Sequence, residues 1–148
     1  MFAFTVAGLI PTLLSSLLID MAHRCVVEGF EVEKFMDNLV KSSPIIGRHT
    51  SLVHISNTDK GIAGVCYVWA PRALQPWGNP LPIQCPVCLA VRSFKKPIVG
   101  TNNTISFTCE GINGNGFTCG EVIYFHKPNN ILTAGLKKSD WIKFSWPQ

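Results

Sequence analysis

Residues 85–88 read CPVC, and residues 109–119 read CEGINGNGFTC. A Cys-x2-Cys turn presents two sulfurs from one short loop, and a second pair of cysteines can complete the four thiolates of a tetrahedral zinc site. The spacing therefore predicts a metal site formed by Cys85, Cys88, Cys109 and Cys119. Four protein ligands leave no position for water or substrate, so the predicted Zn²⁺ is structural rather than catalytic.

The segment between Cys109 and Cys119 decides whether the second pair can close on the first. It contains three glycines and two asparagines, residues that favour turns, so it can loop out and return Cys119 to the metal. Over residues 83–126 the arrangement resembles a zinc ribbon, in which two cysteine knuckles lie at one end of a small antiparallel sheet. A ribbon's second pair is usually closer, which makes His126 the reserve ligand. Free thiols or disulfides are the alternatives to zinc.

The N-terminal half shows the periodicity of a small α/β unit. Apolar residues at helical spacing predict helices over 12–28 and 31–41, and apolar runs between turn residues predict strands over 2–7, 51–55 and 62–69. Residues 1–70 therefore read as a β-α-α-β-β unit, which by itself is an incomplete α/β layer.

A proline-rich joint over residues 71–84 separates this unit from the cysteine-bearing part, because consecutive X-Pro units stay extended. Residues 85–148 are predicted to form a zinc-ribbon-like antiparallel β module. Its predicted strands cover residues 91–99, 104–109, 121–126 and 141–146. The fold class expected for the whole chain is mixed α+β.

Charge is unevenly distributed along the chain. Residues 1–84 contain six Lys/Arg and six Asp/Glu, whereas residues 85–148 contain seven and three. A basic module with aromatic residues favours nucleic acid or an acidic protein as partner, although a solvated rim around an aromatic core gives the same pattern. The candidate nucleic-acid contacts are Arg92, Lys95, Lys96, Lys137 and Lys138.

Composition and motifs argue against two other classes. Apolar residues make up 47% of the chain and charged residues 15%, which excludes a solvated disordered chain. The sequence contains no G-x-S-x-G, no H-E-x-x-H and no phosphate-binding glycine loop. It therefore predicts a non-enzymatic binding module.

Residues 1–19 carry no charge and approach the length that crosses a bilayer. Pro11 interrupts the segment, and the helical pattern continues past Asp20, which favours a strand followed by a buried helix. The expected location is intracellular, in the cytoplasm or nucleus. The alternative is a signal or anchor leading to membrane or secretion, where six cysteines could form three disulfides.

The order strand, proline-started helix, glycine, second helix and strand over residues 2–55 resembles the C-terminal part of a caspase-like, CHAT-type domain. This resemblance implies that the catalytic segment would lie upstream of Met1. The alternative function is therefore a recognition or regulatory remnant of a hydrolase domain without its catalytic residues.

Overall fold

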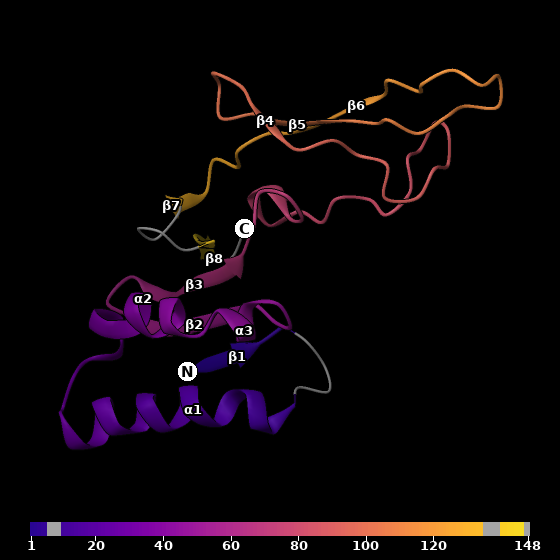
Figure 1. The fold of residues 1–148 in the computed structure, drawn as a ribbon. Coiled ribbons are helices and arrows are strands. Elements are labelled where there is room, and N and C mark those ends of the chain that lie inside the picture. The colour runs from indigo at the N-terminus through magenta and orange to yellow at the C-terminus, as the bar shows by residue number, and fades with distance from the viewer. Residues whose placement is uncertain (6–9, 135–139, 147–148) are drawn as a thin grey trace. The chain divides into compact units, whose positions relative to one another are not determined.

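The computed structural model describes residues 1–5, 10–134 and 140–146. The chain forms two compact units, one comprising residues 1–69 with 130–148 and the other residues 70–129. The second unit is thus inserted between two parts of the first. Each unit has its own antiparallel sheet, and all the helices longer than one turn belong to the first (Figure 1), so the predicted mixed α+β class is confirmed.

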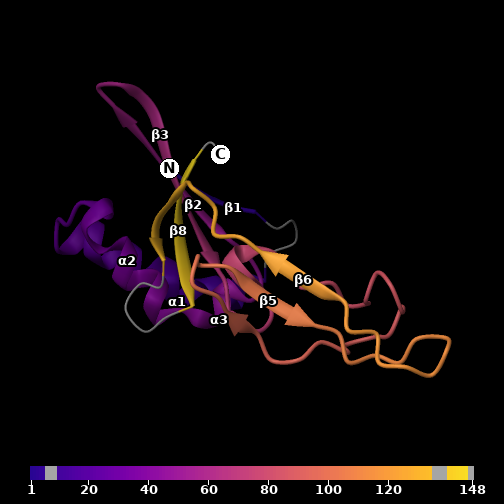
Figure 2. The same cartoon turned by 90° about the horizontal axis from the view of Figure 1, so that it is seen from above.

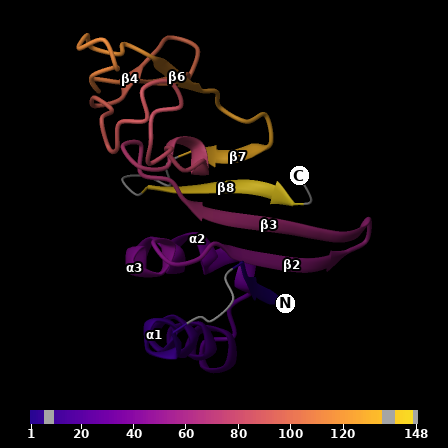
Figure 3. The ribbon, with the colours of Figure 1, turned by 90° about the vertical axis from the view of Figure 1, so that its right-hand side faces the viewer.

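The first unit is built on a five-stranded sheet with the order β1-β2-β3-β8-β7, in which every neighbouring pair is antiparallel. β2 and β3 form a long hairpin (Figure 3), with Leu52 opposite Tyr67 and Thr58 opposite Gly61. The strands are β1 (Phe2–Phe4), β2 (Leu52–Thr58), β3 (Gly61–Trp69), β7 (Ile131–Ala134) and β8 (Trp141–Trp146).

Three α-helices lie between β1 and β2 in the described sequence. They are α1 (Pro11–Ala22), followed by a π-helical turn (His23–Val27), α2 (Val32–Ser42) and the single turn α3 (Pro44–Gly47). Proline begins α1 and α3, where its fixed φ suits a first turn. The helices and the sheet share one core, whose buried members are Leu14, Leu17, Phe35, Met36, Leu39, Val40, Ile46, Leu52, Tyr67 and Trp141.

Polar contacts also fix α2 to the sheet. Asp37 Oδ1 accepts hydrogen bonds from Tyr67 Oη and from Lys143 Nζ, each at 3.0 Å. Burial raises the pKa of Tyr67, and the neighbouring Asp37 carboxylate raises it further. Lys143, one of the basic residues of the C-terminal part, is therefore engaged inside the first unit.

The prediction that residues 141–146 form a fourth strand of the cysteine-bearing module is wrong. This strand, β8, pairs with β3 from Trp69↔Trp141 to Gly64↔Trp146, and Trp141 is fully buried in the core of the first unit. The predicted boundaries change accordingly. The joint over 71–84 falls inside the second unit, and residues 130–148 return to the first. Alternation identifies a strand but not the strand that it pairs with, and the partners here are separated by about half of the chain.

The N-terminal segment is split between a strand and a helix. Phe2–Phe4 pairs with Leu52–His54 in the sheet, and α1 begins only at Pro11. Among the described residues, the helices are too short or too polar to cross a bilayer.

The second unit contains a three-stranded antiparallel sheet with the order β4-β5-β6, formed by β4 (Ile98–Val99), β5 (Ile105–Thr108) and β6 (Val122–Phe125). β5 and β6 lie side by side (Figure 2). Ile105, Phe107 and Cys109 alternate with more exposed residues and are buried, as their spacing predicts. The strand predicted over 91–99 shrinks to two residues, because Pro97 lacks an N–H and Phe94 makes only an isolated bridge to Cys109.

Candidate metal centre

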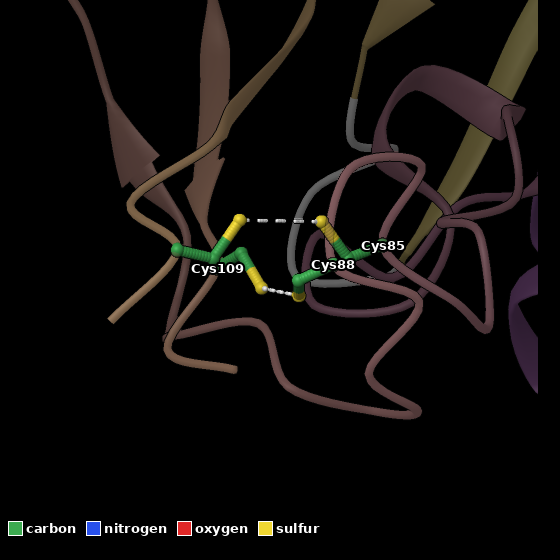
Figure 4. A group of neighbouring side chains, drawn as sticks. Cys85, Cys88 and Cys109 are labelled. Carbon is green, nitrogen blue, oxygen red and sulfur yellow. Dashed lines mark hydrogen bonds between the residues drawn. The ribbon is translucent and has the colours of Figure 1, made fainter. Parts of the chain in front are cut away.

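The four cysteines predicted as ligands lie together in the second unit. Their sulfur atoms are all within 4.8 Å of one another, with 3.8 Å between Cys85 Sγ and Cys119 Sγ and 3.6 Å between Cys88 Sγ and Cys109 Sγ. Figure 4 shows the labelled side chains of Cys85, Cys88 and Cys109 gathered in this cluster. A tetrahedron with Zn–S bonds of about 2.3 Å has sulfur–sulfur edges of about 3.8 Å, so the two shortest separations match zinc geometry.

The cluster is not a pair of disulfides. All four thiols are free, and sulfurs 3.6 Å or more apart are well beyond the disulfide bond length of about 2.0 Å. Cys85 and Cys109 are fully buried, whereas Cys88 and Cys119 are partly exposed. The centre therefore lies at the edge of the unit's core.

Backbone N–H groups lie beside the sulfurs. The N–H of Gly111 donates to Cys109 Sγ at 3.2 Å. Backbone N–H groups also act to lower the pKa of the other three thiols, from Cys88 first and then Val87 at Cys85, from Ala90 at Cys88, and from Glu121 at Cys119. Since such donors favour a thiolate over a thiol, the backbone around the sulfurs suits metal ligands.

The pKa values of the thiols show how closely they interact. The backbone N–H of Cys88, and then that of Val87, lower the pKa of Cys85 to about 7. The N–H of Ala90 acts in the same direction on Cys88, but burial and hydrogen bonds given to the other cysteines raise its pKa to about 12. Four thiolates this close repel one another, so a divalent cation is needed for all of them to ionise together.

The insert between Cys109 and Cys119 forms a small hairpin. Ile112 bridges Thr118, and Asn113 Oδ1 accepts the N–H groups of Asn115 and Phe117 at 3.0 and 3.1 Å. The hairpin returns Cys119 so that its N–H donates to the Gly111 carbonyl at 2.7 Å. The long spacing that separates this chain from a usual ribbon is therefore absorbed without displacing the fourth sulfur.

Gly111 is required by close packing beside the centre, a role that the cysteine spacing did not reveal. A Cβ at this position would lie 2.4 Å from Ala90 Cβ and 2.8 Å from Cys88 Sγ. Ser93 is a second residue that sequence reasoning missed, since its Oγ lies 3.0 Å from Cys109 Sγ. Three glycines in the insert gave a weak signal for Gly111, whereas no motif marked Ser93.

The two cysteine pairs, Cys85–Cys88 and Cys109–Cys119, form the two knuckles. They differ at one equivalent position, the residue that follows the second cysteine of each pair. Leu89 follows Cys88 with φ +60°, and Gly120 follows Cys119 with φ +71°. The left-handed region costs a residue with a Cβ about 1–2 kcal/mol, whereas glycine enters it freely. Leu89 is 66% exposed, so its side chain adds little burial in return.

We expect Leu89→Gly to stabilise the metal-bound second unit by about 0.5–1 kcal/mol, after allowing for the greater chain entropy of glycine when unfolded. Gly120→Leu should destabilise it by about 1 kcal/mol. Thermal unfolding of the two variants measures both effects, which correspond to melting shifts of a few degrees in opposite directions. Shifts of the same sign would contradict this account of the knuckles.

His126, the reserve ligand, is not in the cluster. It lies just beyond the opposite end of β6 from Cys119, where its Nδ1 is 3.4 Å from Thr104 Oγ1. The structure therefore brings Cys119, rather than His126, to the other three sulfurs.

The predicted nucleic-acid contacts occupy different environments. Arg92 and Lys96 are exposed. Lys95 is also exposed, but its Nζ forms an ion pair with Glu110 at 3.0 Å. Lys137 and Lys138 lie outside the described residues. Among the predicted contacts that the structure describes, Arg92 and Lys96 are thus the exposed cations to which it assigns no ion pair.

Comparison with protein-family models, curated proteins and solved structures finds no match to this chain.

Proposed function

We propose that this chain is a non-enzymatic binding protein that holds one structural Zn²⁺ through Cys85, Cys88, Cys109 and Cys119. The observation that supports this most strongly is the convergence of four free thiols whose sulfurs all lie within 4.8 Å of one another. A four-sulfur tetrahedral site suits zinc or iron. Because all four positions of the ion are taken by protein, it stabilises the fold and has no site for a substrate.

Most of the net positive charge of the chain lies in the second unit. Residues 70–129 contain five basic and two acidic residues, which leaves an excess of three positive charges. These are Arg72, Arg92, Lys95, Lys96 and Lys127 against Glu110 and Glu121. The first unit contributes the remaining single positive charge of the chain, so the inserted unit is the better candidate for binding a polyanion.

The alternative, a remnant of a caspase-like domain, predicts an exposed apolar sheet edge or face on the N-terminal unit. We favour the zinc-dependent binding protein because the four clustered cysteines support it directly.

Elemental analysis of the purified full-length protein tests the metal directly. We expect one zinc per chain, retained through dialysis against metal-free buffer, because a closed four-thiolate site binds zinc tightly. A protein that folds fully with no bound metal would contradict the proposal, and so would one iron per chain in place of zinc.

A further inference from the structure

The sheet of the second unit has one buried face and one exposed face. Ile105 and Phe107 point to the buried face and are each 1% exposed. Their neighbours point the other way, and the register places Ile98 opposite Ser106 and Ser106 opposite Tyr124. Ile98 and Tyr124 are 64% and 60% exposed. Ile98 of β4 and Tyr124 of β6 thus lie on the solvent side of the sheet, one on each side of Ser106 of β5.

This exposed face is hollowed at the end of the sheet away from the cysteines. The hollow has a volume of about 310 Å³, and its lining includes Ile98, Thr101, Asn102, Ser106, Tyr124 and His126. These residues provide one aromatic face, one apolar wall and several hydroxyl, amide and imidazole groups. Such a combination can stack a planar ring and hydrogen-bond its edge.

The charged residues nearest to the lining segments along the chain are basic. None of the lining residues is acidic. No charged residue occurs from 97 to 109, and exposed lysines lie just outside the lining segments, Lys96 before β4 and Lys127 after His126. A negatively charged ligand in the hollow would therefore meet no carboxylate among the lining residues, and each lining segment has a lysine next to it in sequence.

The metal centre does not cancel this positive charge. A zinc ion with four thiolates carries a formal charge of −2, but Cys109 and Thr104 are separated by five residues of extended chain, about 16 Å. This distance is about twice the Debye length at physiological ionic strength, roughly 8 Å. The hollow and the centre therefore occupy opposite ends of β5 and act as separate electrostatic environments.

We propose that this hollow binds single-stranded nucleic acid, with one base stacked on Tyr124 and the adjoining phosphates contacted by Lys96 and Lys127. The inference rests on the proposed function, since the centre holds the sheet that presents Tyr124. A single strand is favoured over a duplex because only an unstacked base offers its face to a side chain. A protein partner is disfavoured because polar groups, rather than further large apolar side chains, surround the ring.

The test uses the full-length protein and fluorescently labelled oligonucleotides of about ten nucleotides, the length that a small single-strand site covers. DNA and RNA of the same sequence, each as a single strand, are compared with the DNA duplex by fluorescence anisotropy at low salt. We expect the single strands to bind more tightly than the duplex. A preference for RNA would show that the ribose hydroxyl is also recognised, whereas equal binding would place recognition in the base and phosphate.

Tyr124→Ala should weaken single-strand binding by about 5- to 150-fold, the loss expected for one stacked base. Tyr124→Phe keeps the ring and should bind within about twofold of the unchanged protein, since stacking needs no hydroxyl. Phe117 is the matched control, because it is an aromatic residue of the same unit that is 73% exposed and lies outside the hollow. Phe117→Ala should leave binding unchanged.

The lysines give a second readout, the dependence of binding on salt. Lys96→Gln and Lys127→Gln should each reduce the log–log salt slope by about 0.7, the value for one phosphate of a single strand. Lys95→Gln should change it less, because Glu110 already pairs with Lys95.

Zinc content is measured on every sample so that the two proposals fail separately. Absence of binding by a protein with one zinc per chain overturns the binding site alone, whereas absence of zinc overturns the function on which it rests. Tighter binding to the duplex, an unaffected Tyr124→Ala variant, or a Tyr124→Phe variant as weak as Tyr124→Ala would also overturn the stacking site.

Discussion

Replacing Cys109 with serine is expected to remove the metal from residues 70–129 and to unfold that unit. Cys109 is fully buried, and its sulfur contacts Cys88 Sγ, the Ser93 hydroxyl and the Gly111 N–H. The free energy of binding for structural zinc is about 10–16 kcal/mol. A core of this size rarely supplies more than about 3–5 kcal/mol, so the unit has too little stability to remain folded without the ion.

Elemental analysis together with amide hydrogen exchange measures this loss in each unit. Exchange should become fast across residues 70–129 while the core strands of the first unit stay protected. Cys25→Ser is the matched control, since Cys25 is a free cysteine of the first unit outside the cluster. This control should keep one zinc per chain. Retention of zinc and of exchange protection by Cys109→Ser would rule out the four-cysteine centre.

Replacing Trp141 with alanine should destabilise the first unit by about 3–5 kcal/mol, the usual cost of deleting a large buried aromatic side chain. Trp141 is fully buried in the core that the helices share with the sheet. A Cβ on Gly47 would lie 2.7 Å from its ring, which shows how closely α3 approaches it. The zinc content should stay at one per chain.

Urea unfolding of the first unit, followed by circular dichroism of its helices, measures the change. Trp146→Ala in the same strand serves as the control and should cost less, because Trp146 is 40% exposed. Trp141→Phe keeps much of the buried surface and should fall between the two. Loss of zinc with an unchanged helical transition would instead place residues 141–146 in the cysteine-bearing module.

The cysteines of the metal centre and Trp141 show what the sequence could predict and what it could not. The cysteines of the cluster were predictable because two cysteines in one short turn have a spacing that is typical of a metal site. The strand of Trp141 was also predictable from its alternation, but its partner was not. The alternation of residues 141–146 fits any sheet with a free edge, and only the packing of Trp141 in the core of the first unit places this strand beside β3.

For the same reason, the sequence could not predict contacts between residues that are far apart along the chain. Gly111 is needed because Ala90 and Cys88 lie against it, and neither neighbour is adjacent in sequence. The ion pair between Lys95 and Glu110 likewise joins residues that are not adjacent in sequence. The zinc ion stays a prediction, because the structure provides its ligands and not the ion.

The insertion of the second unit between β3 and β8 has a consequence for the order of folding. The central pairing of the first unit must close over the whole inserted segment, and the entropic cost of such closure grows with the length of disordered chain between the strands. A metal-bound insert holds its two ends at a fixed separation, whereas an unfolded one leaves about 60 residues of flexible chain. Zinc would therefore speed the assembly of a sheet that supplies no ligand to the metal. The refolding rate of the first unit should then depend on the zinc concentration during refolding.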